Sequence, residues 1–78
     1  MDSKIGFIEI IVEDIDNIPE LNSTLSEYGE SIIGRLGIPY HEKKINIITV
    51  VVDASEQTIN NLFLKLKDLR GIKVNVTR

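Results

Sequence analysis

The stretch "GRLGIPYHEKK", from Gly34 to Lys44, holds the greatest chemical variety in the sequence. It contains Arg35, Tyr40 and His41, which is the only histidine. A zinc-binding histidine needs further protein ligands, and a catalytic one must face a nucleophile. The sequence has neither a cysteine nor an HExxH spacing, so we predict no metal and no catalytic role here. We expect His41 in a solvent-facing hairpin turn, with a metal shared between subunits as the alternative.

Carboxylates gather after the first apolar run, at Glu13, Asp14 and Asp16. Such a cluster can hold a hard cation or a ligand amine, but the oxygen-rich spacing of a calcium loop is missing. We therefore interpret the acids as a solvated strand end that also places negative charge at the N-terminus of the next helix, where the helix dipole favours it. The serines lack a GxSxG motif, and no phosphate-binding glycine loop occurs. We predict that the protein is not an enzyme and has no catalytic residue and no cofactor.

The run "KIGFIEIIVE", residues 4–13, predicts the first strand, because it is short and rich in β-branched and aromatic residues. Its side chains alternate between two faces of the sheet. The two faces consist of Ile8, Ile10 and Val12, and of Ile5, Phe7, Glu9 and Ile11. Both faces are largely apolar, which favours a central position for this strand.

Two helices are predicted from apolar residues that recur three and four positions apart. The first follows Asn17, which we expect to cap it together with Glu20, and we expect Gly29 to end it in a left-handed conformation. The second follows Ser55 as its N-cap and carries basic residues near its C-terminal end, and we expect Gly71 to stop it. The apolar stripes are Ile18, Leu21, Leu25 and Tyr28, and Ile59, Leu62, Phe63, Leu66 and Leu69.

Three further strands are predicted over residues 30–40, 45–53 and 72–77. Gly34 and Gly37 indicate a bulge, a bend or a close backbone approach, and Pro39 places its strand at an edge or ends it. The last strand alternates strictly, which is typical of an edge with one solvated face. The order β-α-β-β-α-β predicts one α+β domain over residues 1–78, a two-layer ferredoxin-like sandwich with an antiparallel sheet in the order 4-1-3-2.

Two helices cover only one face of a four-stranded sheet, whereas the first and third strands are apolar on both faces. A contiguous apolar patch of several hundred Å² is rarely left in water, so we expect a second chain to cover the free face. The expected contact residues are Ile5, Phe7 and Ile11, in a homo-oligomer that is a dimer or a tetramer. The alternative is that turns and side chains of the same subunit cap this face.

The charge of the chain argues against a surface that binds nucleic acid directly. The net charge is -3 and the cations are scattered, whereas phosphate binding needs clustered lysine and arginine. No apolar run approaches the roughly 20 residues of a membrane-spanning helix, and no export signal precedes the first strand. We therefore expect a cytoplasmic protein that contacts neither nucleic acid nor membrane.

The string "SEYGESIIGRLGIPYHEKKINIITVVVDAS" resembles the small stand-alone proteins named as regulators of the iron-only hydrogenase system. Their signature runs from a "SEYG" helix end through "GRxGIPY" to an apolar strand that ends in "VD". The opening "KIGFIEIIVED" and the late "GIKV" fit this pattern as well. The resemblance implies an ACT-like fold, similar also to the C-terminal domain of nickel-responsive repressors. Such domains commonly pair through their sheets and bind small effectors at subunit interfaces.

Two departures limit what this resemblance carries over. Amino-acid-binding ACT domains usually have a glycine in the loop after the first strand, whereas this loop reads "EDIDNIPE". Nickel repressors use several histidines and a cysteine, which this sequence does not provide. We therefore expect neither an amino-acid pocket nor a nickel site of those kinds.

The leading hypothesis is a non-enzymatic, oligomeric regulatory module that binds a small effector. Its predicted ligand or interface residues are Arg35, Gly37, Tyr40 and His41. The guanidinium of Arg35 offers a fixed fork to a carboxylate or a phosphate. Control of transcription would then need a protein partner. The alternative is a small assembly or scaffold protein, in which "GRLGIPY" shapes an edge for strand pairing and no small ligand is bound.

Overall fold

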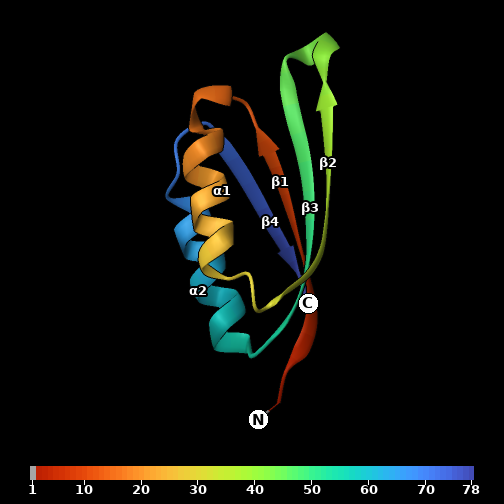
Figure 1. The fold of residues 1–78 in the computed structure, drawn as a ribbon, viewed down its shortest axis with the longest axis vertical. Coiled ribbons are helices and arrows are strands. Elements are labelled where there is room, and N and C mark those ends of the chain that lie inside the picture. Colours follow the sequence, from red (N-terminus) through yellow and green to blue (C-terminus); the bar gives the residue numbers. More distant parts are fainter. Residues whose placement is uncertain (1) are drawn as a thin grey trace.

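The sheet holds four antiparallel strands in the order β2-β3-β1-β4 (Figure 1). This computed structural model describes residues 2–78. The elements are β1 (Lys4–Val12), α1 (Ile18–Glu27), β2 (Ile32–Tyr40), β3 (Ile45–Ala54), α2 (Glu56–Lys67) and β4 (Ile72–Thr77), with 3-10 turns at Ile15–Asn17 and His41–Lys43. Read from its other edge, the sheet order is 4-1-3-2, so the predicted ferredoxin-like sandwich is confirmed.

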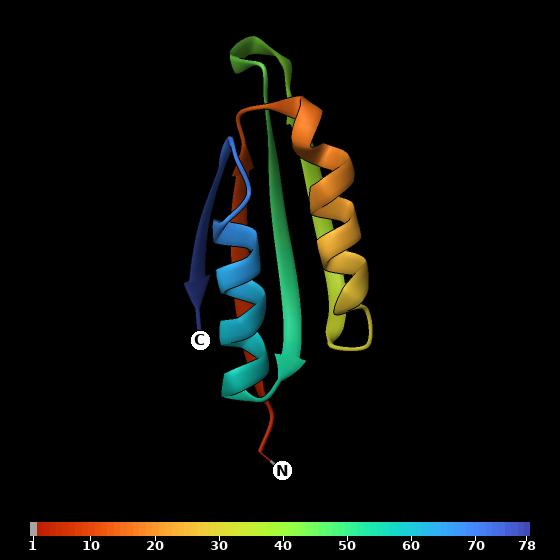
Figure 2. The same ribbon diagram turned by 90° about the vertical axis from the view of Figure 1, so that its left-hand side faces the viewer.

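Both helices pack on the same face of the sheet, and Figure 2 shows them from that side. There α2 lies over β1 and beside β4, whereas α1 lies over β2. The sandwich therefore has one covered face and one free face.

In the part of the chain that the structure describes, neither helix has the length and apolar character needed to cross a membrane.

The core fills the space between the helices and the central strands. Ile8, Ile10 and Val12 of β1 are fully buried there, as their alternation predicts. Burial of each such side chain stabilises the fold by about 1.5–3 kcal/mol relative to exposure. The other core residues are Leu21 and Leu25 of α1, Ile48, Val50, Val52 and Ala54 of β3, and Ile59, Leu62 and Leu66 of α2.

The two ends of α1 differ from the prediction. The side chain of Asn17 makes no capping bond, because its Nδ2 donates instead to the carbonyl of Arg70. The expected capping pair of Asn17 with Glu20 is therefore wrong. Gly29 is not left-handed either, since the chain leaves the helix through Tyr28, whose N–H donates back to the last turn.

The N-terminus of α2 agrees with the prediction, and its C-terminus does not. Ser55 Oγ accepts a hydrogen bond from the N–H of Thr58 at 3.2 Å, which caps the helix. The helix ends at Lys67, before Gly71 is reached. Gly71 has a φ of 67° and shapes the turn that leads into β4 instead.

Strand β2 is an edge strand, as Pro39 predicts, and its pairing with β3 is interrupted once. Ile32 pairs with Val52 and Gly34 pairs with Val51, so the residue between them forms a bulge. This irregularity fixes which residues of β2 face the helices. On the other edge, the residues of β4 alternate between half-buried and exposed, as predicted.

Candidate functional site

The sheet face opposite the helices has no covering element in residues 2–78 (Figure 1). Three side chains of β1 point to it and remain partly exposed: Ile5 at 47%, Phe7 at 45% and Ile11 at 38%. Strands β2 and β3 place further apolar side chains beside these on the same face of the sheet. We call this surface the open face, and its apolar residues are Ile5, Phe7, Ile11, Leu36, Ile38, Tyr40, Ile45, Ile47 and Val51.

A polar strip crosses the open face beside these residues. Glu9 lies opposite Thr49 of β3 and Asn75 of β4, and Asn75 Nδ2 donates to Glu9 Oε1 at 3.1 Å. Lys73 and Thr77 continue the strip along β4. The open face is therefore apolar toward β2 and polar toward β4.

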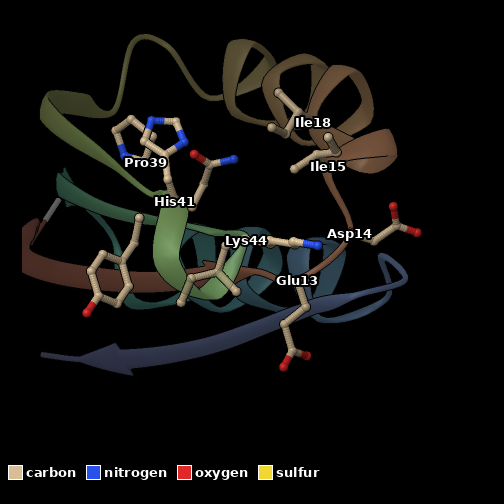
Figure 3. Close-up of a pocket in the computed structure, with 10 residues that line it drawn as sticks. Glu13, Asp14, Ile15, Ile18, Pro39, His41 and Lys44 are labelled. Atoms are coloured by element: carbon tan, nitrogen blue, oxygen red, sulfur yellow. The ribbon is translucent and has the colours of Figure 1, made fainter.

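A groove lies between α1 and β2, on the helix side of the sheet. Its wider end, shown in Figure 3, has a volume of about 610 Å³ and lies between the turn after β1 and the β2–β3 hairpin. The lining of this end includes the apolar Ile15, Ile18 and Pro39 and the ionisable Glu13, Asp14 and Lys44. Apolar and ionisable side chains therefore line the same hollow.

The narrower end of the groove has a volume of about 380 Å³ and continues along β2. Ile18, Pro39 and Asn46 line both ends, so the two hollows adjoin. At Gly37 the hollow is open, because an added Cβ would meet no atom within 4 Å. We call the two hollows together the α1–β2 groove, and each has a volume typical of small-molecule sites.

Arg35 stands at the narrow end of this groove, where α1 orients its guanidinium. Arg35 Nη2 donates to Asn22 Oδ1 at 3.1 Å. None of the salt bridges found among residues 2–78 involves Arg35. A guanidinium carries five N–H donors, so others remain for a carboxylate or a phosphate.

The four residues predicted as ligand or interface contacts do not share one surface. Arg35 and Gly37 pair with helix-facing residues of β3, so they lie on the groove side of the sheet. Tyr40 pairs with Ile45 on the opposite side, because five positions along a strand reverse the direction of a side chain. His41 lies exposed in the hairpin turn where the sequence predicts it, at the wide end of the groove with Tyr40 at the rim.

The sequence pattern did not reveal two groove residues of α1. Ile18 and Asn22 are four positions apart, so they lie one above the other on the same side of the helix. Ile18 belongs to the predicted apolar stripe of this helix, but it is only partly buried and also lines the groove. The spacing was the available signal, whereas the neighbouring strand that makes it a groove comes from the tertiary structure.

Contacts between two turns hold the wide end of the groove. The carbonyl of Gly71 accepts hydrogen bonds from the N–H groups of Glu13 at 2.7 Å and Asp14 at 3.4 Å. Asp14 Oδ1 accepts from the N–H of Asp16 at 3.0 Å and so caps the 3-10 turn ahead of α1. Across the described residues, no three carboxylates or histidines gather closely enough to hold a metal ion. These acids thus organise the turn itself.

Two surface carboxylate–ammonium contacts shift the pKa of Glu56 and of Lys65, and both lie outside the groove. A hydrogen bond from Lys4 is the main cause that lowers the pKa of Glu56, and the charge of Arg78 adds to it. A hydrogen bond to Glu27 is the main cause that raises the pKa of Lys65. None of these paired residues lines the groove.

Comparison with known proteins agrees with the fold and supplies a family. The sequence matches, over residues 4–76, the family described as "TM1266-like: Iron-only hydrogenase system regulator, putative". The solved structure of the uncharacterized protein TM1266 from Thermotoga maritima is similar, with a TM-score of 0.92 and 26% sequence identity over 97% of this chain and 96% of that chain. No curated protein matches the sequence. The chain therefore belongs to the TM1266-like family.

Proposed function

We propose that the protein is a non-enzymatic regulatory module whose chains pair through the open face. The observation that carries this proposal is the exposure of large apolar side chains on one face of the sheet. Phe7, Leu36 and Ile38 are 45%, 61% and 47% exposed there. Apolar surface of this extent is rarely left in water. The family name supports the regulatory part of the proposal.

The size of the open face sets the strength of pairing that we expect. Four strands spaced about 4.8 Å apart make a surface about 19 Å wide and, at these strand lengths, about 25 Å long. A pair that covers this face on both chains buries about 1,000 Å² in total, which is the lower limit for a specific interface. We therefore expect a dimer that dissociates in the micromolar range.

A second copy of the chain is the partner that the pattern of the open face favours. Its apolar half lies toward β2 and its polar strip toward β4. A twofold axis that crosses the strands places the apolar half of one chain on the apolar half of the other, and polar strip on polar strip. Such self-complementarity is what a symmetric dimer interface requires.

Sedimentation equilibrium over a range of protein concentrations tests this proposal. We expect the wild-type chain to dimerise and Phe7→Lys to remain monomeric, because the substitution places a charge among the apolar side chains of the open face. Leu64→Lys is the matched control, since Leu64 is 53% exposed on the outer side of α2. A folded wild-type chain that stays monomeric at the highest concentration would contradict the proposal.

Strand β2 favours a second candidate, an assembly protein that binds through strand pairing. It is a free edge of nine residues, and Ile33 in its bulge is 62% exposed. A long apolar edge strand can add a further strand, although Pro39 removes one donor from it. Ile33→Lys distinguishes the candidates, because it should disrupt pairing at the edge and leave pairing through the open face unchanged.

A further inference from the structure

We propose that the α1–β2 groove binds an amphipathic organic anion, whose carboxylate or phosphate pairs with Arg35 while its apolar body lies between Ile18 and Pro39. This inference rests on the proposed regulatory function, to which it adds the chemical class of the effector. Its basis is the charge and shape of the groove along its length.

Arg35 provides the recognition of the anionic group. Asn22 Oδ1 holds one guanidinium N–H at 3.1 Å, so the side chain is oriented before a ligand arrives. No carboxylate within residues 2–78 forms a salt bridge with Arg35. An oriented guanidinium without a counter-ion binds carboxylate or phosphate through two parallel hydrogen bonds.

The middle of the groove suits an apolar body. Ile18 and Pro39 line it from the helix and from the strand, and Ile48, which is 7% exposed, lies at its base. Gly37 leaves this space unfilled, since an added Cβ would meet nothing within 4 Å. The five residues from Arg35 to Pro39 span four residue steps, or about 13 Å of extended strand, which sets the length of ligand that fits.

The wide end of the groove determines the direction in which the ligand lies. Glu13 and Asp14 line this end together with Lys44, as Figure 3 shows. Lys73 is within 3.7 Å of Glu13, and the backbone N–H of Asp16 is within 3.0 Å of Asp14. The charges of Lys44 and Lys73 balance those of the two carboxylates, so this end offers no net positive charge to an anionic group. The charged end of the ligand is therefore directed to Arg35, and the uncharged end to the hairpin.

A titration of the full chain with octanoate, octyl phosphate and octan-1-ol, followed by two-dimensional amide NMR spectra, tests this inference. We expect saturable shifts at the amides of Arg35 and Gly37 with at least one of the two anions. We expect octan-1-ol to bind about tenfold or more weakly, because it lacks the charge-assisted hydrogen bonds. The ratio of the two anion affinities shows whether the site prefers a carboxylate or a phosphate.

Variants of β2 distinguish ligand binding in the groove from ligand binding on the open face. Arg35→Gln should weaken binding of the anions about tenfold or more and leave the affinity for octan-1-ol unchanged. Arg35→Lys keeps the charge without the fork and should give an intermediate affinity. Gly37→Val should abolish the saturable shifts by filling the groove. Gly34→Val is the matched control, because this glycine is also open but pairs with Val51 on the opposite face.

Four results would overturn the inference. They are the absence of saturable shifts with either anion, equal affinity for octan-1-ol, equal effects of Gly34→Val and Gly37→Val, and shifts confined to open-face amides such as those of Phe7 and Ile11. Sedimentation of the same samples keeps this inference distinct from the proposed pairing. A monomer that binds octanoate in the groove contradicts only the pairing, and a dimer that binds no anion contradicts only the effector class.

Discussion

Gly71→Ala tests the structural logic of the wide end of the groove. Gly71 has a φ of 67°, and a Cβ added there would lie 2.5 Å from Asp14 Cβ. The left-handed conformation alone costs an alanine about 1–2 kcal/mol. The clash forces the two turns apart, which weakens the 2.7 Å hydrogen bond from Glu13 N–H to Gly71 O and costs about 1 kcal/mol more. We therefore expect a loss of about 2–3 kcal/mol in the free energy of unfolding.

This loss is large for a chain of this size. At about 0.05–0.15 kcal/mol per residue, 78 residues give a free energy of unfolding of about 4–12 kcal/mol. Urea unfolding followed by far-UV circular dichroism measures the change as a shift in midpoint at constant slope. The protein concentration must be the same for every variant, because pairing of the chains would add to the apparent stability.

Gly37→Ala is the matched control for this experiment. Its added Cβ meets no atom within 4 Å, and its φ is not left-handed. Alanine reduces the entropy of the unfolded chain, so we expect this variant to be unchanged or more stable by about 0.4–1 kcal/mol. A loss below about 1 kcal/mol for Gly71→Ala, or an equal loss in both variants, would refute the reasoning.

Three further predictions concern single residues of the turns and of α2. Lys44 is left-handed at a φ of 55°, so Lys44→Gly should raise the free energy of unfolding by about 1 kcal/mol in the same urea assay, whereas Lys44→Ala should not. Ser55→Ala removes the hydrogen bond from Thr58 N–H and should cost about 1 kcal/mol, which thermal unfolding would detect. Because contact with Lys4 lowers the pKa of Glu56, this carboxylate stabilises the fold above its ordinary pKa of 4.5, and the contribution is lost as the pH falls through the lowered pKa. The urea midpoints of wild type and Glu56→Gln should therefore differ at neutral pH and converge in acid, and a constant difference would contradict this.

Patterns that depend on neighbours along the chain predicted the fold well. The alternation in β1 separated its buried residues from its exposed ones, and Ser55 marked the start of α2, because a strand face and an N-cap are each defined within a few residues. A prediction failed where a group distant in the sequence binds the side chain on which the prediction depended. Asn17 carries a capping side chain, yet the carbonyl of Arg70, distant in sequence, takes its hydrogen bond.

The candidate site was less predictable from the sequence than the fold. Arg35 and Tyr40 were grouped because they are close along the chain, whereas an odd separation on a strand places them on opposite faces. The α1–β2 groove exists only because α1 packs over β2, so the four-residue spacing of Ile18 and Asn22 indicates a shared side of the helix but not a groove. The prediction for Arg35, Gly37, Tyr40 and His41 therefore stays a prediction, now divided between two surfaces.

Strand β2 belongs to both surfaces at once. Its even and odd positions past the bulge alternate between the open face and the groove, with Leu36 and Ile38 on one side and Arg35 and Gly37 on the other. A single peptide segment thus forms the wall between the two. If a partner chain and a groove ligand both bind there, their affinities are thermodynamically linked: whatever factor the ligand applies to pairing, pairing must apply to the ligand. Because only the backbone of β2 separates the two sites, such a coupling would act over a short distance.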